Sequence, residues 1–300
     1  MSEHIVHTAV LEDAFALGVR WPLLSEEFRR ILAEQLSFAR LGCVTVSGDR
    51  FSFYLLDRLK KIWPTHSYED EIKLGFVLGW INHRACDRQM KPIWNEPAFR
   101  GRGTDVDPTL SPTECSVYHE GHMWREYFKD CPVFLYALFP EEAEGLSVYP
   151  LLNHKAAYSF LRTAYAMNMM DIQTLPDTLA EDDYFCELCM RAQKFYVDLN
   201  RYRKSAKDPD PDLIWDFITR INWYDEKDEI VAAARKIRFE GDATFPKNLA
   251  SAKSHYGMAL EKSLSYFFAA DLYLHNPDMT VEELRNMLDI GKLGPNGLPV

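Results

Sequence analysis

The chain has 300 residues, a formal net charge of −11, 47% hydrophobic residues and 26% charged residues. This composition predicts a globular protein with a sizeable core and excludes wholesale disorder. The acidic balance argues against a nucleic-acid-binding surface, because contacts with phosphates need an excess of lysine and arginine.

The first residues lack the basic stretch and apolar run of a signal peptide, so we expect none. No segment approaches the ~18 consecutive apolar residues that a membrane-spanning helix requires. The six cysteines are scattered along the chain, which is typical of reduced thiols and not of a disulfide framework. Together these features predict a cytoplasmic protein without a membrane span.

Apolar residues recur at helical spacing through most of the chain, which predicts an all-α, multi-helix bundle. In the first part we expect helices over 7–19, 24–41, 49–63, 68–90 and 111–129. In the second part we expect helices over 153–169, 178–205, 210–224, 226–239, 249–276 and 280–290. Ser25 is the predicted N-cap of the second helix, and Thr280 and Glu283 form a predicted capping box before the last one.

The expected helix over 68–90 is apolar on most sides, which predicts a buried central position. Its Gly75 and Gly79, four residues apart, would let a neighbouring helix approach closely. Residues 91–111 contain three prolines and two glycines and are predicted to form a loop. We expect one helical domain over 1–300, with a core of about residues 1–205 and a C-terminal helical layer of about 206–290.

Two predicted helices carry histidines and carboxylates at metal-binding spacing. His83 and Asp87 lie four residues apart, so they share one helix face. His119, His122 and Glu126 share a face of the helix over 111–129 in the same way. Imidazole and carboxylate are ligands that zinc, iron and manganese accept. For His83 and Asp87 the spacing alone favours a His–Asp hydrogen bond inside the core. For the second helix an exposed polar stripe is the competing interpretation.

Three further residues have simple local interpretations when each is taken by itself. His7 lies near the start of the first predicted helix, and His66 lies just before the long helix over 68–90, where it would be a cap or turn residue. Asp49 would be an N-cap.

The order of these motifs resembles that of the zinc-dependent phospholipase C family and its single-strand nuclease relatives, over roughly the first 130 residues. The segments that carry the resemblance are His7-Thr8-Ala9, the run from Leu41 to Asp49, His66, Gly79-x-x-x-His83-x-x-x-Asp87-x-x-x-x-Pro92, and His122-x-x-x-Glu126. That family holds up to three zinc ions in an all-helical bundle.

The resemblance implies seven metal ligands in this chain, with the Asp of the H-x-x-x-D pair bridging two ions: His7, Asp49, His66, His83, Asp87, His122 and Glu126. The family usually has a histidine two residues after the proline that follows H-x-x-x-D, where this chain has Trp94. His119, on the same face as His122, could take its place. One to three divalent ions, with zinc first, are therefore expected between helices of the N-terminal half.

An ion held by such ligands lowers the pKa of a coordinated water to near neutral and offsets charge on a phosphoryl oxygen. The resemblance therefore implies hydrolysis of a phosphoester, by a phosphodiesterase or a phospholipase C-like enzyme acting on a small phosphoester or a phospholipid headgroup. Asp49 and Asp87 are the candidate catalytic residues, with Asp49 orienting or deprotonating the water. Arg100 and Arg102 could hold the phosphate by bidentate contacts, or lie on a solvated loop.

Two other interpretations of the same residues lead to different functions. Another class of helical metal-dependent phosphohydrolases is recognised by an adjacent His-Asp pair, and this sequence contains none. The alternative from a different functional class is a non-catalytic helical interaction protein that retains a degenerate metal site.

Overall fold

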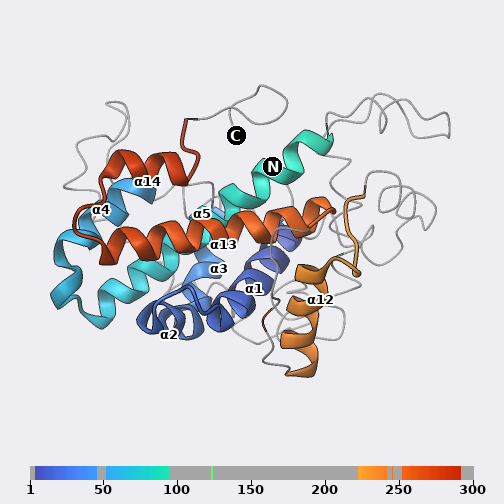
Figure 1. The fold of residues 1–300 in the computed structure, drawn as a ribbon, viewed down its shortest axis with the longest axis horizontal. Coiled ribbons are helices and arrows are strands. Elements are labelled where there is room, and N and C mark those ends of the chain that lie inside the picture. Colours follow the sequence, from blue (N-terminus) through green and yellow to red (C-terminus); the bar gives the residue numbers. More distant parts are fainter. Residues whose placement is uncertain are drawn as a thin grey trace, which may run out of the picture.

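The computed structural model describes residues 4–45, 52–94, 123, 222–241, 245 and 252–291. These residues form helices and no strand, which confirms the all-α prediction for this part of the chain (Figure 1). None of these helices combines the length and apolar character needed to cross a membrane. The elements are α1 (His4–Arg20), α2 (Glu26–Glu34), α3 (Leu36–Thr45), α4 (Ser52–Ile62), the 3₁₀ turn η1 (Trp63–Thr65), α5 (Tyr68–Trp94), α12 (Glu229–Arg235), the π-helical turn η4 (Lys236–Glu240), α13 (His255–His275) and α14 (Val281–Met287).

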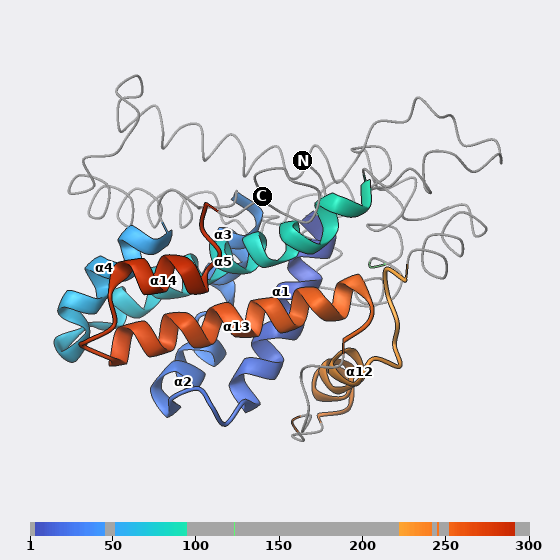
Figure 2. The same cartoon turned by 45° about the horizontal axis from the view of Figure 1, so that its top comes forward.

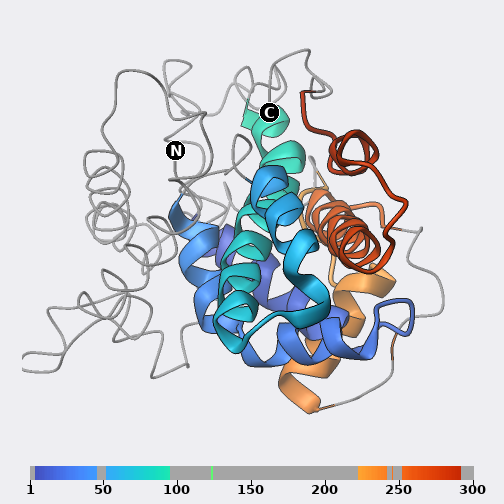
Figure 3. The same ribbon diagram turned by 90° about the vertical axis from the view of Figure 1, so that its left-hand side faces the viewer.

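Helix α5 lies at the centre of the described bundle, as its apolar pattern predicted. It packs against α1, α2, α3, α4 and α13. The view in Figure 3 places α3 on one side of α5 and α13 with α14 on the other. Helix α13 runs alongside both α5 and α1, so segments from the two ends of the chain share one core (Figure 2).

The tightest helix contact joins α3 and α5 through glycines. A Cβ atom added to Gly42 would overlap the carbonyl oxygen of Phe76, and one added to Gly79 would overlap that of Ala39. At Gly75 an added Cβ would lie 2.6 Å from the Cβ of Gln35. Because these neighbours are mostly backbone, they cannot move aside. The predicted close approach at Gly75 and Gly79 is confirmed, with α3 as the partner helix.

The single helix expected over 24–41 is wrong, because the chain breaks at Gln35 into α2 and α3. Gln35 closes α2 through its N–H to the carbonyl of Ile31, and its own carbonyl accepts from Phe38 and Ala39 at the start of α3. The backbone stays hydrogen-bonded through this bend, so neither glycine nor proline is needed there. The bend lets α3 lie along the glycines of α5.

Helix α5 also extends four residues beyond its predicted end at Met90, through Pro92 to Trp94. The predicted loop 91–111 therefore begins with a helical turn, and its remaining residues lie outside the described part of the chain. A proline removes one backbone donor and disfavours, without forbidding, a helical residue before it. In the last turn of a long helix this loss affects a single backbone hydrogen bond.

Two predicted caps are confirmed. The Ser25 hydroxyl accepts from the Phe28 N–H and so begins α2. The same residue donates from its N–H and its hydroxyl, each at 2.7 Å, to the carboxylate of Asp271 on α13. Thr280 and Glu283 form the expected capping box of α14. The first of these caps therefore also joins two helices that are distant in sequence.

The C-terminal end of α14 is held by two arginines of α5. Arg84 donates to the carbonyls of Leu288 and Asp289, and Arg88 donates to the Asp289 carbonyl at 2.7 Å. Cations at a helix C-terminus compensate its exposed carbonyls and its dipole. Asp289, two residues after the last helical residue Met287, has a positive φ of 56°, so the helix does not continue there.

Replacing Gly79 with alanine should lower the free energy of unfolding by roughly 3 kcal/mol, because the new methyl group meets backbone of α3 that cannot relax. Gly18→Ala is the matched control, since its added Cβ would meet the flexible end of Leu32. Urea unfolding would measure both variants. A Gly79→Ala chain no less stable than Gly18→Ala would contradict the tight α3–α5 contact.

Stability should fall as pH rises through the pKa of His275. Partial burial opposes its charge, but the backbone of Asp271 and the carboxylate of Glu27, whose Oε2 lies 3.0 Å from Nε2, raise this pKa above the ordinary 6.5. The folded state therefore binds the proton more tightly, and the gain is complete below about pH 6.5 and is lost above the raised pKa. When the free energy of unfolding is measured from pH 5 to 9, the pH-dependent contribution of His275 should be absent from the His275→Gln variant.

Candidate metal centre

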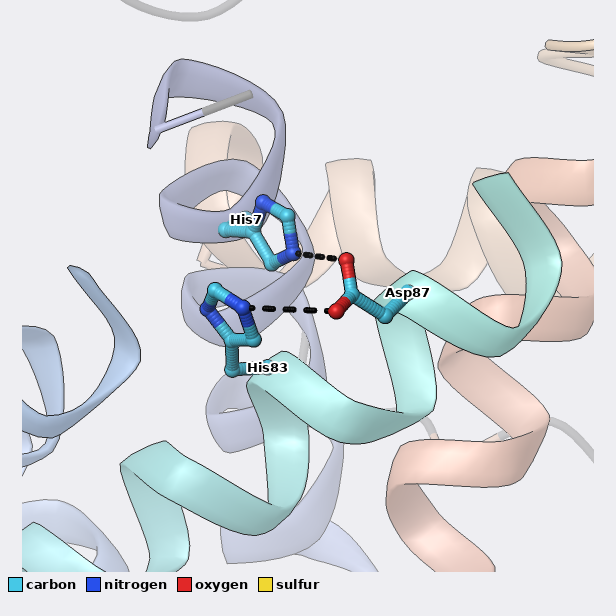
Figure 4. Close-up of side chains that lie close together, drawn as sticks. All are labelled: His7, His83 and Asp87. Carbon is cyan, nitrogen blue, oxygen red and sulfur yellow. Dashed lines mark ion pairs between the residues drawn. The ribbon is translucent and has the colours of Figure 1, made fainter. Parts of the chain in front are cut away.

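Three of the predicted ligands meet between α1 and α5 (Figure 4). His83 and Asp87 project from one face of α5, as their spacing of four residues predicted. His7 comes from α1, which crosses α5 at this level, and it points toward the same carboxylate. Suitable ligand atoms of the three side chains all lie within 4.8 Å of one another, so the group could hold a metal ion.

Each oxygen of Asp87 faces a different imidazole. Oδ1 lies 3.3 Å from His7 Nε2, and Oδ2 lies 3.5 Å from His83 Nε2. These separations exceed those of ordinary N–H···O hydrogen bonds, which fall between about 2.7 and 3.2 Å. The two rings stack with their centroids 4.0 Å apart and their planes 21° from parallel. The two imidazoles therefore lie stacked on the same side of the carboxylate.

The carboxylate is deeply buried but ionised. Asp87 is 3% exposed and His7 2% exposed, whereas the side chain of His83 is 15% exposed. Burial alone would raise the pKa of Asp87, but the adjacent imidazoles of His83 and His7 hold it well below its ordinary value. At neutral pH Asp87 is therefore a carboxylate, the form that binds cations, and His83 is the most accessible member of the group.

A backbone contact fixes the orientation of His83. Its Nδ1 lies 2.5 Å from the carbonyl oxygen of Cys43 on α3. A carbonyl only accepts, so Nδ1 carries a proton and Nε2 is the nitrogen turned toward Asp87. In neutral His83 the Nε2 lone pair would then face a carboxylate oxygen, which is repulsive. A cation between the two atoms would remove this repulsion.

His66 does not join this group. It lies before the first turn of α5, and about 22 Å of helix separates Tyr68 from His83. Its Nδ1 lies 2.6 Å from the carbonyl oxygen of Trp63, and its Nε2 lies 3.2 Å from the Glu71 carboxylate. Its ring also stacks on that of Trp63. The structure thus gives His66 a local role at the N-terminal end of α5.

The other predicted site residues lie outside the described part of the chain: Asp49, Arg100, Arg102, His119, His122 and Glu126. Sequence reasoning also missed two contributors, the carbonyl of Cys43 and the amide of Asn82. Both belong to segments that carry the motifs, but their contacts depend on how closely α3 approaches α5. Gly75 and Gly79 were the one available signal of that approach.

Comparisons with models of known protein families, with curated proteins and with solved structures find no match to this chain. The assignment of a function therefore depends on the residues of the site and on the chemistry that they allow.

The metal content of the chain provides a direct check on this group. Protein purified without chelator or immobilised nickel should carry at least one equivalent of zinc, iron or manganese. A His83→Ala/Asp87→Ala double variant should lose it, because two of three clustered ligands are gone. The His66→Ala variant should keep it, because His66 lies at the far end of α5. Elemental analysis of all three would exclude the site if the double variant retained its metal.

Proposed function

We propose that this chain is a metal-dependent phosphoester hydrolase whose metal centre includes His7, His83 and Asp87. One observation carries the proposal. An imidazole from α1 and an H-x-x-x-D pair from α5 converge on one buried carboxylate and engage its two oxygens separately. Local spacing relates only His83 to Asp87, whereas the resemblance to the zinc-dependent phospholipase C family implied His7 as well.

The geometry of the three groups is compatible with a bound cation. Ligands about 2.1 Å from a tetrahedral ion lie about 3.4 Å from one another. The His7–Asp87 and His83–Asp87 separations are 3.3 and 3.5 Å to the two different oxygens of Asp87, and one ligand atom of each residue lies within 4.8 Å of the others. The unfavourable approach of the His83 lone pair to a carboxylate oxygen disappears once a cation lies between them. These features support the fit of a divalent ion.

Zinc is the ion we propose first. Two imidazoles and one carboxylate form a zinc site that leaves a fourth position open for water or substrate. The same set also accepts iron, so availability would decide between them. The resemblance to the zinc-dependent phospholipase C family also implies a second ion, for which Asp87 would be a shared ligand.

When bound, such an ion activates a water and stabilises charge on a phosphoryl oxygen. Asp87 supplies the permanent negative charge that holds the ion, and its burial keeps competing water away. His83, the most exposed of the three, marks the side from which a phosphoester would approach. Orientation of the water by Asp49, binding of phosphate by Arg100 and Arg102, and further ligation by His119, His122 and Glu126 belong to the same proposal.

Near-complete burial of His7 and Asp87 also favours a second candidate, a non-catalytic helical interaction protein with a structural ion. Structural sites are closed by their protein ligands, whereas catalytic sites keep a position open. The two candidates differ in whether the metal-loaded chain turns over a phosphoester.

Zinc-loaded protein should hydrolyse bis(p-nitrophenyl) phosphate, and chelation should abolish the activity. Asp87→Asn should lower kcat/KM at least about 100-fold, because it removes the charge that holds the ion. His275→Gln, which changes a histidine at the opposite end of the bundle, should retain the activity of the parent chain. Metal-loaded protein without turnover would favour the non-catalytic candidate.

A further inference from the structure

Asn82, the residue before His83, reaches the helix that carries His7. It is fully buried, and its amide nitrogen lies 3.5 Å from the backbone carbonyl oxygen of His7 and 3.6 Å from the sulfur of Cys43. A backbone carbonyl only accepts, so the amide nitrogen is the atom of Asn82 that faces it. Asn82 therefore connects α5 to the residue of α1 that supplies a metal ligand.

Cys43 makes the same connection from α3. Its thiol donates to the His7 carbonyl at 3.3 Å, while its own carbonyl accepts from His83 Nδ1. One residue of α3 thus contacts both histidines, the side chain of His83 and the backbone of His7.

The His7 carbonyl belongs to the hydrogen-bond ladder of α1 and has a second lone pair for outside donors. Contacts from two different helices, 3.3 Å from the Cys43 sulfur and 3.5 Å from the Asn82 amide nitrogen, converge on this one atom and would limit how α1 can slide or rotate against α5. A rotation of α1 would swing the His7 imidazole away from Asp87. These contacts thus act on the direction of the ligand more than on the integrity of the helix.

The amide of Asn82 is poorly explained by stability alone. Among the described residues its Oδ1 has no hydrogen-bond partner, although it is buried. A buried acceptor without a partner costs about 1–3 kcal/mol, which an apolar side chain would avoid. The donor half of the amide makes the useful contact, and it faces the backbone behind a metal ligand.

We propose that Asn82, together with Cys43, is a positioning residue that holds His7 in line with Asp87 and so sets the metal affinity. The inference rests on the proposed metal centre and adds residues that do not touch the ion. Partners behind metal ligands typically contribute 10–100-fold to affinity.

The test measures Zn²⁺ affinity of the full-length chain by competition with a chromophoric chelator. Asn82→Leu and Asn82→Ala should each bind Zn²⁺ about 10–100-fold more weakly than the parent chain. Because Cys43 approaches the same carbonyl, Asn82→Leu/Cys43→Ala should bind more weakly still. The matched controls are Gln35→Met and Gln35→Ala, which also remove a buried amide whose polar atoms lack partners among the described residues. Gln35 does not approach His7, so these controls should keep the parent affinity.

Parent affinity in either Asn82 variant, or an equal loss in the Gln35 controls, would overturn the positioning role. Thermal unfolding of the zinc-free proteins adds a second criterion: failure of both Asn82 variants to fold would assign Asn82 to the core instead. Absence of Zn²⁺ binding by the parent chain itself would overturn the proposed metal centre, and the inference with it. If the parent chain binds Zn²⁺ and the Asn82 variants bind it with the same affinity, the positioning role of Asn82 is overturned but the proposed metal centre is not.

Discussion

The close contact between α3 and α5 determines most of what surrounds the site. Three glycines let the two backbones meet: an added side chain would collide with backbone atoms at Gly42 and Gly79 and with the Cβ atom of Gln35 at Gly75. Because the helices are so close, the Cys43 carbonyl can reach the His83 ring, and Asn82 can reach both α3 and α1. A larger separation would leave the imidazole free to rotate and the His7 backbone without its outside donors. The orientation of the ligands is therefore a consequence of backbone packing.

Local chemistry was sufficient to predict the parts of the fold that depend on a few neighbouring residues. Ser25 and Thr280 cap their helices through their own hydroxyls, and the apolar pattern of α5 reflects its burial. The bend at Gln35 was not predictable, since that residue has no unusual backbone preference and bends because α3 must lie along α5. The extension of α5 past Pro92 likewise reflects how little a proline costs in a last turn.

The candidate site likewise has a part that the sequence predicted and a part that it could not predict. The pairing of His83 with Asp87 follows from helical periodicity, whereas the arrival of His7 depends on how α1 crosses α5, which spacing cannot give. His66 was predicted to be a ligand but lies far from the site. It lies close to His83 in sequence, but a straight helix converts that short interval into a long distance. A shared ion therefore requires residues on the same turns of helix or on elements that cross there.

The pairing of α5 with α13 has a consequence for the order of folding during synthesis. Helix α5 ends at Trp94 and α13 begins at His255, so residues 95–254 must be made before the two can meet. At about 5–20 residues per second, this interval lasts about 10–30 s. Throughout that time the side of α5 that α13 will cover lacks its native partner. This face of α5 therefore waits for α13 far longer than the microseconds that a helix needs to form.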